Sequence, residues 1–288
     1  MTRRPATAHP DNHHRHASPW IVEFTGKPGT GKTTLTSAIA DRPGFFDTPG
    51  LIDCIVSECI PLSSVLDRLP GLDRPPDGSW LKQRLYDYLL YRRQKQQIYR
   101  NRPGLVDELS GIVDEGDHEC DDFAADLYRW ALQTIALCRQ VRRLPIRGAA
   151  YLADEGPVHR AISLFGDRPP ASATSMAEDY FRHLRPPDLL VICQASDRTC
   201  KQRLTSRSSG LPRRLRDATS ETIDRFLSTA GALCGEAARY FDHHGSDVMW
   251  LDTDKLTIDD ASRAVEQAIE KLGQRKPARR LCFDTGRQ

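Results

Sequence analysis

The chain lacks the features that mark membrane, secreted or zinc-binding proteins. No apolar run approaches the roughly 18 residues that a membrane-spanning helix needs. The eight cysteines are scattered and form no Cys-x-x-Cys pair, which argues against a disulfide framework or a zinc site. The first ten residues have no apolar core of the kind found in signal peptides. Together these absences predict a soluble, cytoplasmic protein with reduced thiols.

A strong charge of one sign is also missing. The net charge is +2, although 28% of the 288 residues are charged. No global field therefore indicates a membrane surface or a nucleic acid as partner. The length suits one large α/β domain or two small ones. A homodimer stays open as the assembly state.

The two ends of the chain have the composition of tails. Residues 1–18 are rich in Pro, His and small polar residues and contain almost nothing apolar, so we expect them to be disordered. Residues 274–288 are basic and show no helical periodicity, which predicts a flexible basic tail. One domain over residues 19–273 is expected between them.

The stretch Gly26-Lys-Pro-Gly-Thr-Gly-Lys-Thr33 fits the phosphate-binding pattern of Gly, four residues, Gly-Lys and then Ser or Thr. An apolar run at 20–25 predicts a strand leading into it, and residues 33–40 predict a helix leaving it. Backbone N–H groups and the helix dipole would then surround an anion. Lys32 would reach the β- and γ-phosphates, and the Thr33 hydroxyl would ligate Mg²⁺. The expected nucleotide-binding residues are Gly26, Pro28, Gly29, Thr30, Gly31, Lys32, Thr33 and Thr34.

Strand and helix signals alternate along the rest of the chain, as in a mainly parallel sheet. Further strands are predicted at residues 51–57, 149–153, 189–194 and 247–251, and helices at 79–99, 122–144 and 258–272. The fold class is therefore α/β: a P-loop NTPase three-layer sandwich with a five-stranded, mainly parallel sheet. A helical insertion is expected at about 60–145 and a lid at about 203–217.

Carboxylates at strand ends are the first candidates for chemistry, because ligands of open parallel sheets gather there. Glu58 follows the predicted second strand, and Asp154-Glu155 follow the third. Such a carboxylate can hold Mg²⁺ or accept a proton from an acceptor hydroxyl. Among the three acidic pairs that follow apolar residues, Asp154-Glu155 is the preferred choice. The acidic pairs Asp107-Glu108 and Asp114-Glu115 lie in a stretch that reads as a solvated loop.

Arginines form a second group. Six of them crowd into residues 198–216, around Ser208-Ser209-Gly210. Arg203 and Arg207 are four residues apart at the end of a predicted helix, so we expect both to project from one face. Guanidinium groups suit the charge that phosphoryl transfer places on equatorial oxygens, so we expect a lid that closes over the triphosphate.

Three stretches resemble the thymidylate kinase-like branch of the P-loop nucleoside and nucleotide kinases: Phe24 to Thr34, Pro187 to Cys193, and Arg203-x-x-x-Arg207. Residues 89–94 (Leu-Leu-Tyr-Arg-Arg-Gln) are similar to that family's acceptor-facing helix. The resemblance spans about residues 20–272, and only the phosphate loop is highly specific. It implies ATP and Mg²⁺ as cofactors. It also implies a lid with Arg203 and Arg207, and acceptor contacts at Arg92 or Arg93. Glu155 and Arg160 are further acceptor-side candidates.

The chain departs from that family in two ways. Thymidylate kinases carry Asp-Arg-Tyr after the third strand, whereas Asp154-Glu155-Gly156 stands here, and the interval before that strand is longer. Glu58 resembles the position of the catalytic base in deoxynucleoside kinases, without the neighbouring proline. Glu58 and Asp154 are therefore rival bases.

Other nucleotide-dependent classes fit less well. The chain has no Asn-Lys-x-Asp guanine motif, and Leu109-Ser-Gly111 stops short of the transporter ATPase signature. We therefore expect a small-molecule kinase that transfers the γ-phosphate to a nucleoside, nucleotide or other small hydroxyl-bearing acceptor. The alternative is a Mg-ATPase or nucleotide-dependent switch that acts on a macromolecular partner.

Overall fold

The computed structural model describes residues 18–52, 91–114, 121–144, 150–207 and 210–275. Its strands are β1 (Trp20–Thr25), β2 (Phe45–Phe46), β3 (Ala150–Ala153), β4 (Leu189–Gln194) and β5 (Asp247–Asp252). Every strand pairing among them is parallel, in the order β2-β3-β1-β4-β5. The predicted fold class is confirmed. No helix in this described part is long and apolar enough to cross a membrane.

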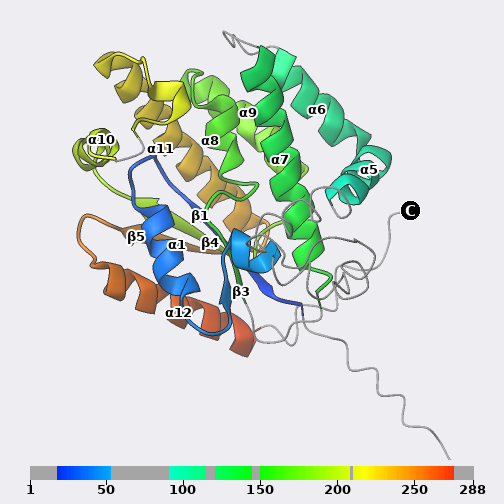
Figure 1. The fold of residues 1–288 in the computed structure, drawn as a ribbon, viewed down its shortest axis with the longest axis vertical. Helices are drawn as coiled ribbons and strands as arrows, with labels where there is room; N and C mark the ends of the chain where they lie inside the picture. Colours follow the sequence, from blue (N-terminus) through cyan, green and yellow to red (C-terminus); the bar gives the residue numbers. More distant parts are fainter. Residues whose placement is uncertain (1–17, 53–90, 115–120, 145–149, 208–209, 276–288) are drawn as a thin grey trace, which may run out of the picture.

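Helices cover both faces of the sheet, which gives three layers (Figure 1). One face packs against α1 (Lys32–Ala40) and α12 (Ile258–Arg275) through a core that includes Val22, Leu35 and Val265. The other face carries the larger core. The helices on that side are α7 (Asp121–Val141), α8 (Arg160–Phe165), α9 (Pro170–Arg182) and α11 (Ser220–His243), with α5 (Arg92–Asn101) and α6 (Pro103–Asp114) packed outside α7.

The sheet positions the candidate site because all its strands run the same way. Their carboxyl ends lie together at one edge, where β1 leads into the phosphate loop and β3 leads into residues 154–159. β4 leads into α10 (Asp197–Thr205) at the same edge, followed by a short 3-10 helix, η2 (Arg213–Leu215). This is the edge at which ligands of open parallel sheets bind.

The predicted second strand at 51–57 is wrong in its described part. Residues 48–52 are helical, and the second strand is the shorter β2 before them. The Asp47 carboxylate accepts the N–H of Gly50 at 2.8 Å, and the Asp47 carbonyl accepts that of Leu51 at 2.9 Å. Asp47 therefore starts a helical turn, and Leu51 and Ile52 are buried from it. Residues 53–57 lie outside the described residues.

The acidic stretch that was expected to be a solvated loop is helical up to Asp114. Leu105 and Leu109 lie one helical turn apart in α6 and are 1% and 0% exposed. Asp107 is exposed. The apolar spacing of a single amphipathic face therefore outweighs the local density of acidic residues.

Candidate functional site

The phosphate loop takes the sharp turn that its glycines permit. Gly26, Gly29 and Gly31 all have positive φ angles, of 153°, 87° and 86°. A Cβ atom at Gly26 would lie 2.3 Å from the carbonyl oxygen of Cys193, and one at Gly29 would lie 2.6 Å from that of Cys200. Glycine is required at these two positions because any side chain would collide with backbone.

Helix α1 begins directly after this turn with an open N-terminus. Its N-cap, Gly31, provides no side-chain cap, and no acidic residue stands in the first turn. The first N–H groups of the helix have no intrahelical acceptor and carry the positive end of the dipole. The loop and helix therefore have the geometry of an anion site.

Lys32 bends back over the loop. Its Nζ donates to the carbonyl oxygens of Gly26 at 2.9 Å and Lys27 at 3.2 Å. The side chain is buried, and burial lowers its pKa, while the nearby Asp154 and Glu155 oppose that change. An ammonium held in this way would gain a favourable partner if phosphate oxygens entered the loop.

Thr33 and Asp154 meet at the mouth of the loop. The Thr33 Oγ1 donates to Asp154 Oδ2 at 3.4 Å. Burial, followed by the charge of Glu155, raises the pKa of Asp154. A hydroxyl and one carboxylate fit Mg²⁺, which prefers oxygen ligands and usually takes one or two carboxylates together with substrate phosphates. Among the described ranges, no group of three or more His, Cys, Asp or Glu side chains gathers as a metal site.

A buried polar network, which was not predicted from the sequence, joins β1 to residues 156–159. Glu23 of β1 is 2% exposed, and its Oε1 accepts the backbone N–H of His159 at 2.8 Å. The Thr25 hydroxyl lies 3.2 Å from Nδ1 of His159. A Cβ at Gly156 would lie 2.4 Å from the Glu23 carboxyl carbon, so residues 154–159 close directly over Glu23. A glutamate inside an otherwise apolar strand was the available signal.

Burial dominates the electrostatics of this network. It raises the pKa of Glu23 to about 8, although N–H groups of His159 and Val158 oppose the change. It also holds the pKa of His159 well below the usual range. The imidazole is therefore neutral, and Glu23 changes charge as the pH passes through about 8.

Glu23 should make folding stability depend on pH. Its folded pKa of about 8 lies above the usual 4.5, so its contribution is complete below 4.5 and is lost as pH rises through about 8. In the wild type this loss lowers the free energy of unfolding between pH 6 and 9, and Glu23→Gln should make that fall smaller by on the order of 2 kcal/mol. Urea denaturation at both pH values measures this. The exposed Glu270→Gln is the control. If Glu23→Gln lost as much unfolding free energy between the two pH values as the wild type, the raised pKa of Glu23 would be contradicted.

Arg203 closes the loop from the side of α10. Its guanidinium donates to the carbonyl oxygen of Gly29 at 3.3 Å and to that of Thr253 at 3.1 Å. The Thr253 hydroxyl in turn donates to the carbonyl of Thr30 at 2.9 Å. Thr253, which the sequence analysis did not select, thus joins the residues after β5 to the phosphate loop. In this structure, Arg203 braces the loop.

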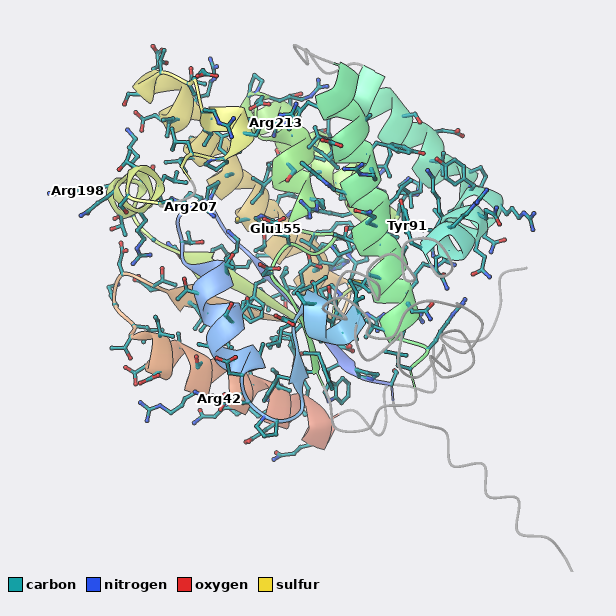
Figure 2. The ribbon with its side chains drawn as sticks, viewed as in Figure 1. Arg42, Tyr91, Glu155, Arg198, Arg207 and Arg213 are labelled. Atoms are coloured by element: carbon teal, nitrogen blue, oxygen red, sulfur yellow. The ribbon has the colours of Figure 1, made fainter. Side chains whose placement is uncertain are left out.

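The other arginines of the expected lid differ from one another. Figure 2 shows Arg198 on the outer side of α10 and Arg207 on the side nearer the phosphate loop. Arg213 pairs with Asp126 of α7 at 3.4 Å. Arg214 is largely buried and pairs with Asp167 at 2.8 Å. Arg207 is exposed and lies beyond the end of α10, so the predicted helix face shared with Arg203 is wrong, and its role in a lid stays a prediction.

The acceptor-side candidates are only partly brought together. Glu155 pairs with Arg160 at 3.0 Å beside Asp154, and the Arg160 guanidinium lies 5.7 Å from the Trp130 ring centre. Figure 2 shows Glu155 at the end of the sheet, close to the loop. Glu58 lies outside the described residues. Arg93 belongs to α5, and only its backbone is described.

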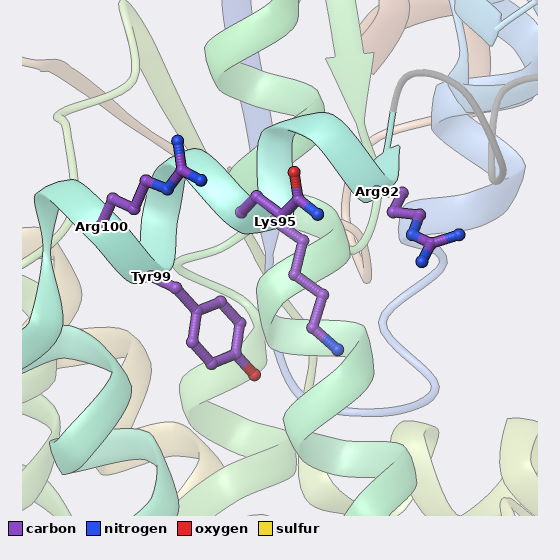
Figure 3. A pocket seen from close by; sticks show the side chains of 5 residues that line it. Arg92, Lys95, Tyr99 and Arg100 are labelled. Carbon is purple, nitrogen blue, oxygen red and sulfur yellow. The ribbon is translucent and has the colours of Figure 1, made fainter.

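Arg92 is placed away from this group. Figure 1 shows α5 at the outer edge, with α7 and α8 between it and the phosphate loop. An open hollow on α5 is lined by Arg92, Lys95, Gln96, Tyr99 and Arg100 (Figure 3). Because its described lining comes from a single helix, it does not form an acceptor pocket with the loop. The acceptor role of Arg92 stays a prediction.

Comparison with known proteins gives a distant structural resemblance. No family model and no curated protein matches the chain. Solved structures of the deoxyadenosine kinase from M. mycoides are similar. The one with products dCMP and a flexible dCDP gives a TM-score of 0.48 at 11% identity, covering 87% of this chain and 99% of that chain. The one with bound dATP gives 0.43 at 11% identity, with 86% and 98% covered. The similarity concerns the fold alone.

Proposed function

We propose that this chain is an ATP- and Mg²⁺-dependent phosphotransferase for a small, hydroxyl-bearing acceptor, such as a nucleoside or nucleotide. One observation supports this most strongly: the phosphate loop, the Lys32 ammonium and the Thr33–Asp154 pair converge at the carboxyl edge of the sheet. The sequence resemblance to the thymidylate kinase-like branch agrees with it. In this proposal the kinase-like domain spans residues 19–273.

The residues divide the work in a defined way. The loop N–H groups and Lys32 would bind the β- and γ-phosphates, and Thr33 and Asp154 would hold Mg²⁺. When bound, Mg²⁺ would neutralise charge on the phosphates. Asp154 or Glu58 would take the proton of the acceptor hydroxyl as its oxygen bonds to the γ-phosphorus. The bond between that phosphorus and the β-γ bridging oxygen breaks, and ADP leaves.

An assay of ADP release with and without acceptors tests the proposal. ADP is measured with Mg-ATP alone and then with nucleosides, nucleotides, sugars and amino compounds. We expect at least one acceptor to raise ADP release at least about 100-fold, because positioning of both reactants supplies much of the rate. Turnover that no acceptor changes would contradict the kinase and favour the alternative, a Mg-ATPase or switch.

A further inference from the structure

Arginines gather at the end of the sheet opposite the phosphate loop. Helices α5, α7 and α9 all end there, and residues 183–188 lead into the start of β4. The N–H of Ile21, at the start of β1, donates to Asp188 at 2.9 Å, which places this region at the amino ends of the strands. The phosphate loop lies at the other end of β1. The two regions are therefore separate sites.

Four of these residues form what we call the arginine cluster: Arg102, Arg139, Arg143 and Arg185. Three are exposed, and Arg139 is half-buried among them. Burial lowers the pKa of Arg139, and repulsion from the other three guanidinium groups lowers it further. Each of the three exposed guanidinium groups is therefore close enough to act on Arg139.

Neighbouring hydrogen bonds hold the cluster in place. Arg102 donates to the carbonyl of His183 at 2.7 Å, which ties the end of α5 to the end of α9. Arg143 donates to the side-chain oxygen of Gln97 at 3.5 Å. The carboxylate of Asp188 is engaged elsewhere, by Arg142 at 3.6 Å and by the N–H of Ile21. Within the described ranges, no carboxylate forms an ion pair with any of the four.

Helix dipoles compensate only part of the positive charge of the arginine cluster. Three helix C-termini supply roughly half a negative charge each, and the N-terminus of α6 roughly half a positive charge, against four full positive charges. The dipoles also leave one group unexplained. Nη1 of Arg139 is shielded from solvent and has no hydrogen-bond partner among the residues that the structure describes. A buried donor without an acceptor is unfavourable, and a phosphate oxygen would satisfy it once the neighbouring side chains moved aside to admit the anion.

We propose that the arginine cluster binds an oligophosphate anion, either free or as the phosphate chain of a nucleotide. Guanidinium groups bind phosphate oxygens in pairs, and three exposed ones around a half-buried one match an anion with several such groups. The basic residues of α5 shown in Figure 3, Arg92, Lys95 and Arg100, add to the positive field on this side. The recognised chemistry differs from that of the phosphate loop because side-chain guanidinium groups carry most of the positive charge, with the N-terminus of α6 standing directly after Arg102.

The test uses tripolyphosphate and ATP as separate probes, measured by calorimetry on the full chain carrying Lys32→Ala to weaken the phosphate loop. In this background we expect tripolyphosphate to bind, and the exposed pair Arg143→Gln/Arg185→Gln to weaken its binding at least 10-fold. Arg263→Gln, an exposed charge on α12 paired with Asp260, is the matched control and should change binding less than 2-fold. Circular dichroism checks the fold of each variant.

The outcomes separate the two sources of the anion. Binding of both probes with the same loss in the double variant identifies a nucleotide's phosphate chain as a ligand, and binding of tripolyphosphate alone identifies a free oligophosphate. Absence of tripolyphosphate binding would overturn the proposal, as would equal weakening by Arg263→Gln. Binding of ATP without tripolyphosphate would also overturn it, because recognition would then depend on the nucleoside.

Discussion

Replacing Lys32 by alanine is expected to lower ATP turnover at least about 100- to 1,000-fold, the loss typical of removing one charge-stabilising donor. The Lys32 Nζ lies over the phosphate loop and is held by the carbonyls of Gly26 and Lys27. The loop's other lysine, Lys27, pairs with Asp197 instead. The fold should survive, because the lost hydrogen bonds are offset by removal of a buried charge whose pKa burial already lowers.

Steady-state turnover and thermal unfolding should be measured on the same samples. Lys271→Ala, an exposed lysine on α12, is the matched control and should keep full activity. Wild-type turnover in a folded Lys32→Ala protein would show that the loop does not serve catalysis. A large fall in unfolding temperature would instead assign Lys32 a structural role.

Replacing Asp154 by asparagine is expected to lower turnover about 100- to 10,000-fold, the range of a lost base or metal ligand. Asparagine keeps the shape and the contact with Thr33 but removes the charge. A metal-binding role predicts that more Mg²⁺ is needed for half-maximal activity. A base role predicts that the acid limb of the pH–rate profile disappears, and the raised pKa of Asp154 places that limb above the usual range for aspartate.

Glu58→Gln, tested in parallel, decides between the rival bases. The variant with the larger fall in turnover at saturating Mg²⁺ carries the base role. Asp259→Asn, on α12, controls for loss of a carboxylate far from the loop. Small, equal losses in Asp154→Asn and Glu58→Gln would exclude both residues.

The sequence predicted the central sheet because its strands carry strong local signals. Residues 189–193 form a continuous apolar run, and β4 has the predicted bounds of 189–194. The phosphate loop was equally easy to recognise, because its glycines stand at fixed positions in the motif. The structure requires glycine at positions 26 and 29, where a side chain would collide with the carbonyls of Cys193 and Cys200. In both cases the information lies within a few consecutive residues.

Elements that depend on distant neighbours were harder to predict. β2 has two residues, Phe45 and Phe46, and exists as a strand through its pairing with β3. The stronger apolar run that follows forms a helical turn begun by Asp47, at least up to residue 52. An edge strand this short has no periodicity to detect.

The supporting residues of the site were missed for the same reason. Glu23 and His159 are 136 positions apart and meet only in the folded chain. Thr253 reaches Thr30 across the sheet edge, 223 positions away. The spacing of residues along the chain identified the phosphate loop, because its motif is local. It could not identify the residues that support the loop from distant parts of the sequence.

Transfer of labelled phosphate tests the central claim most directly. ATP labelled at the γ-phosphate is incubated with the protein, Mg²⁺ and the acceptor that raises ADP release most, and the products are separated. The proposed kinase predicts label in the acceptor, in equal amount to the ADP formed, and none in Lys32→Ala. Label that appears only as inorganic phosphate would contradict it.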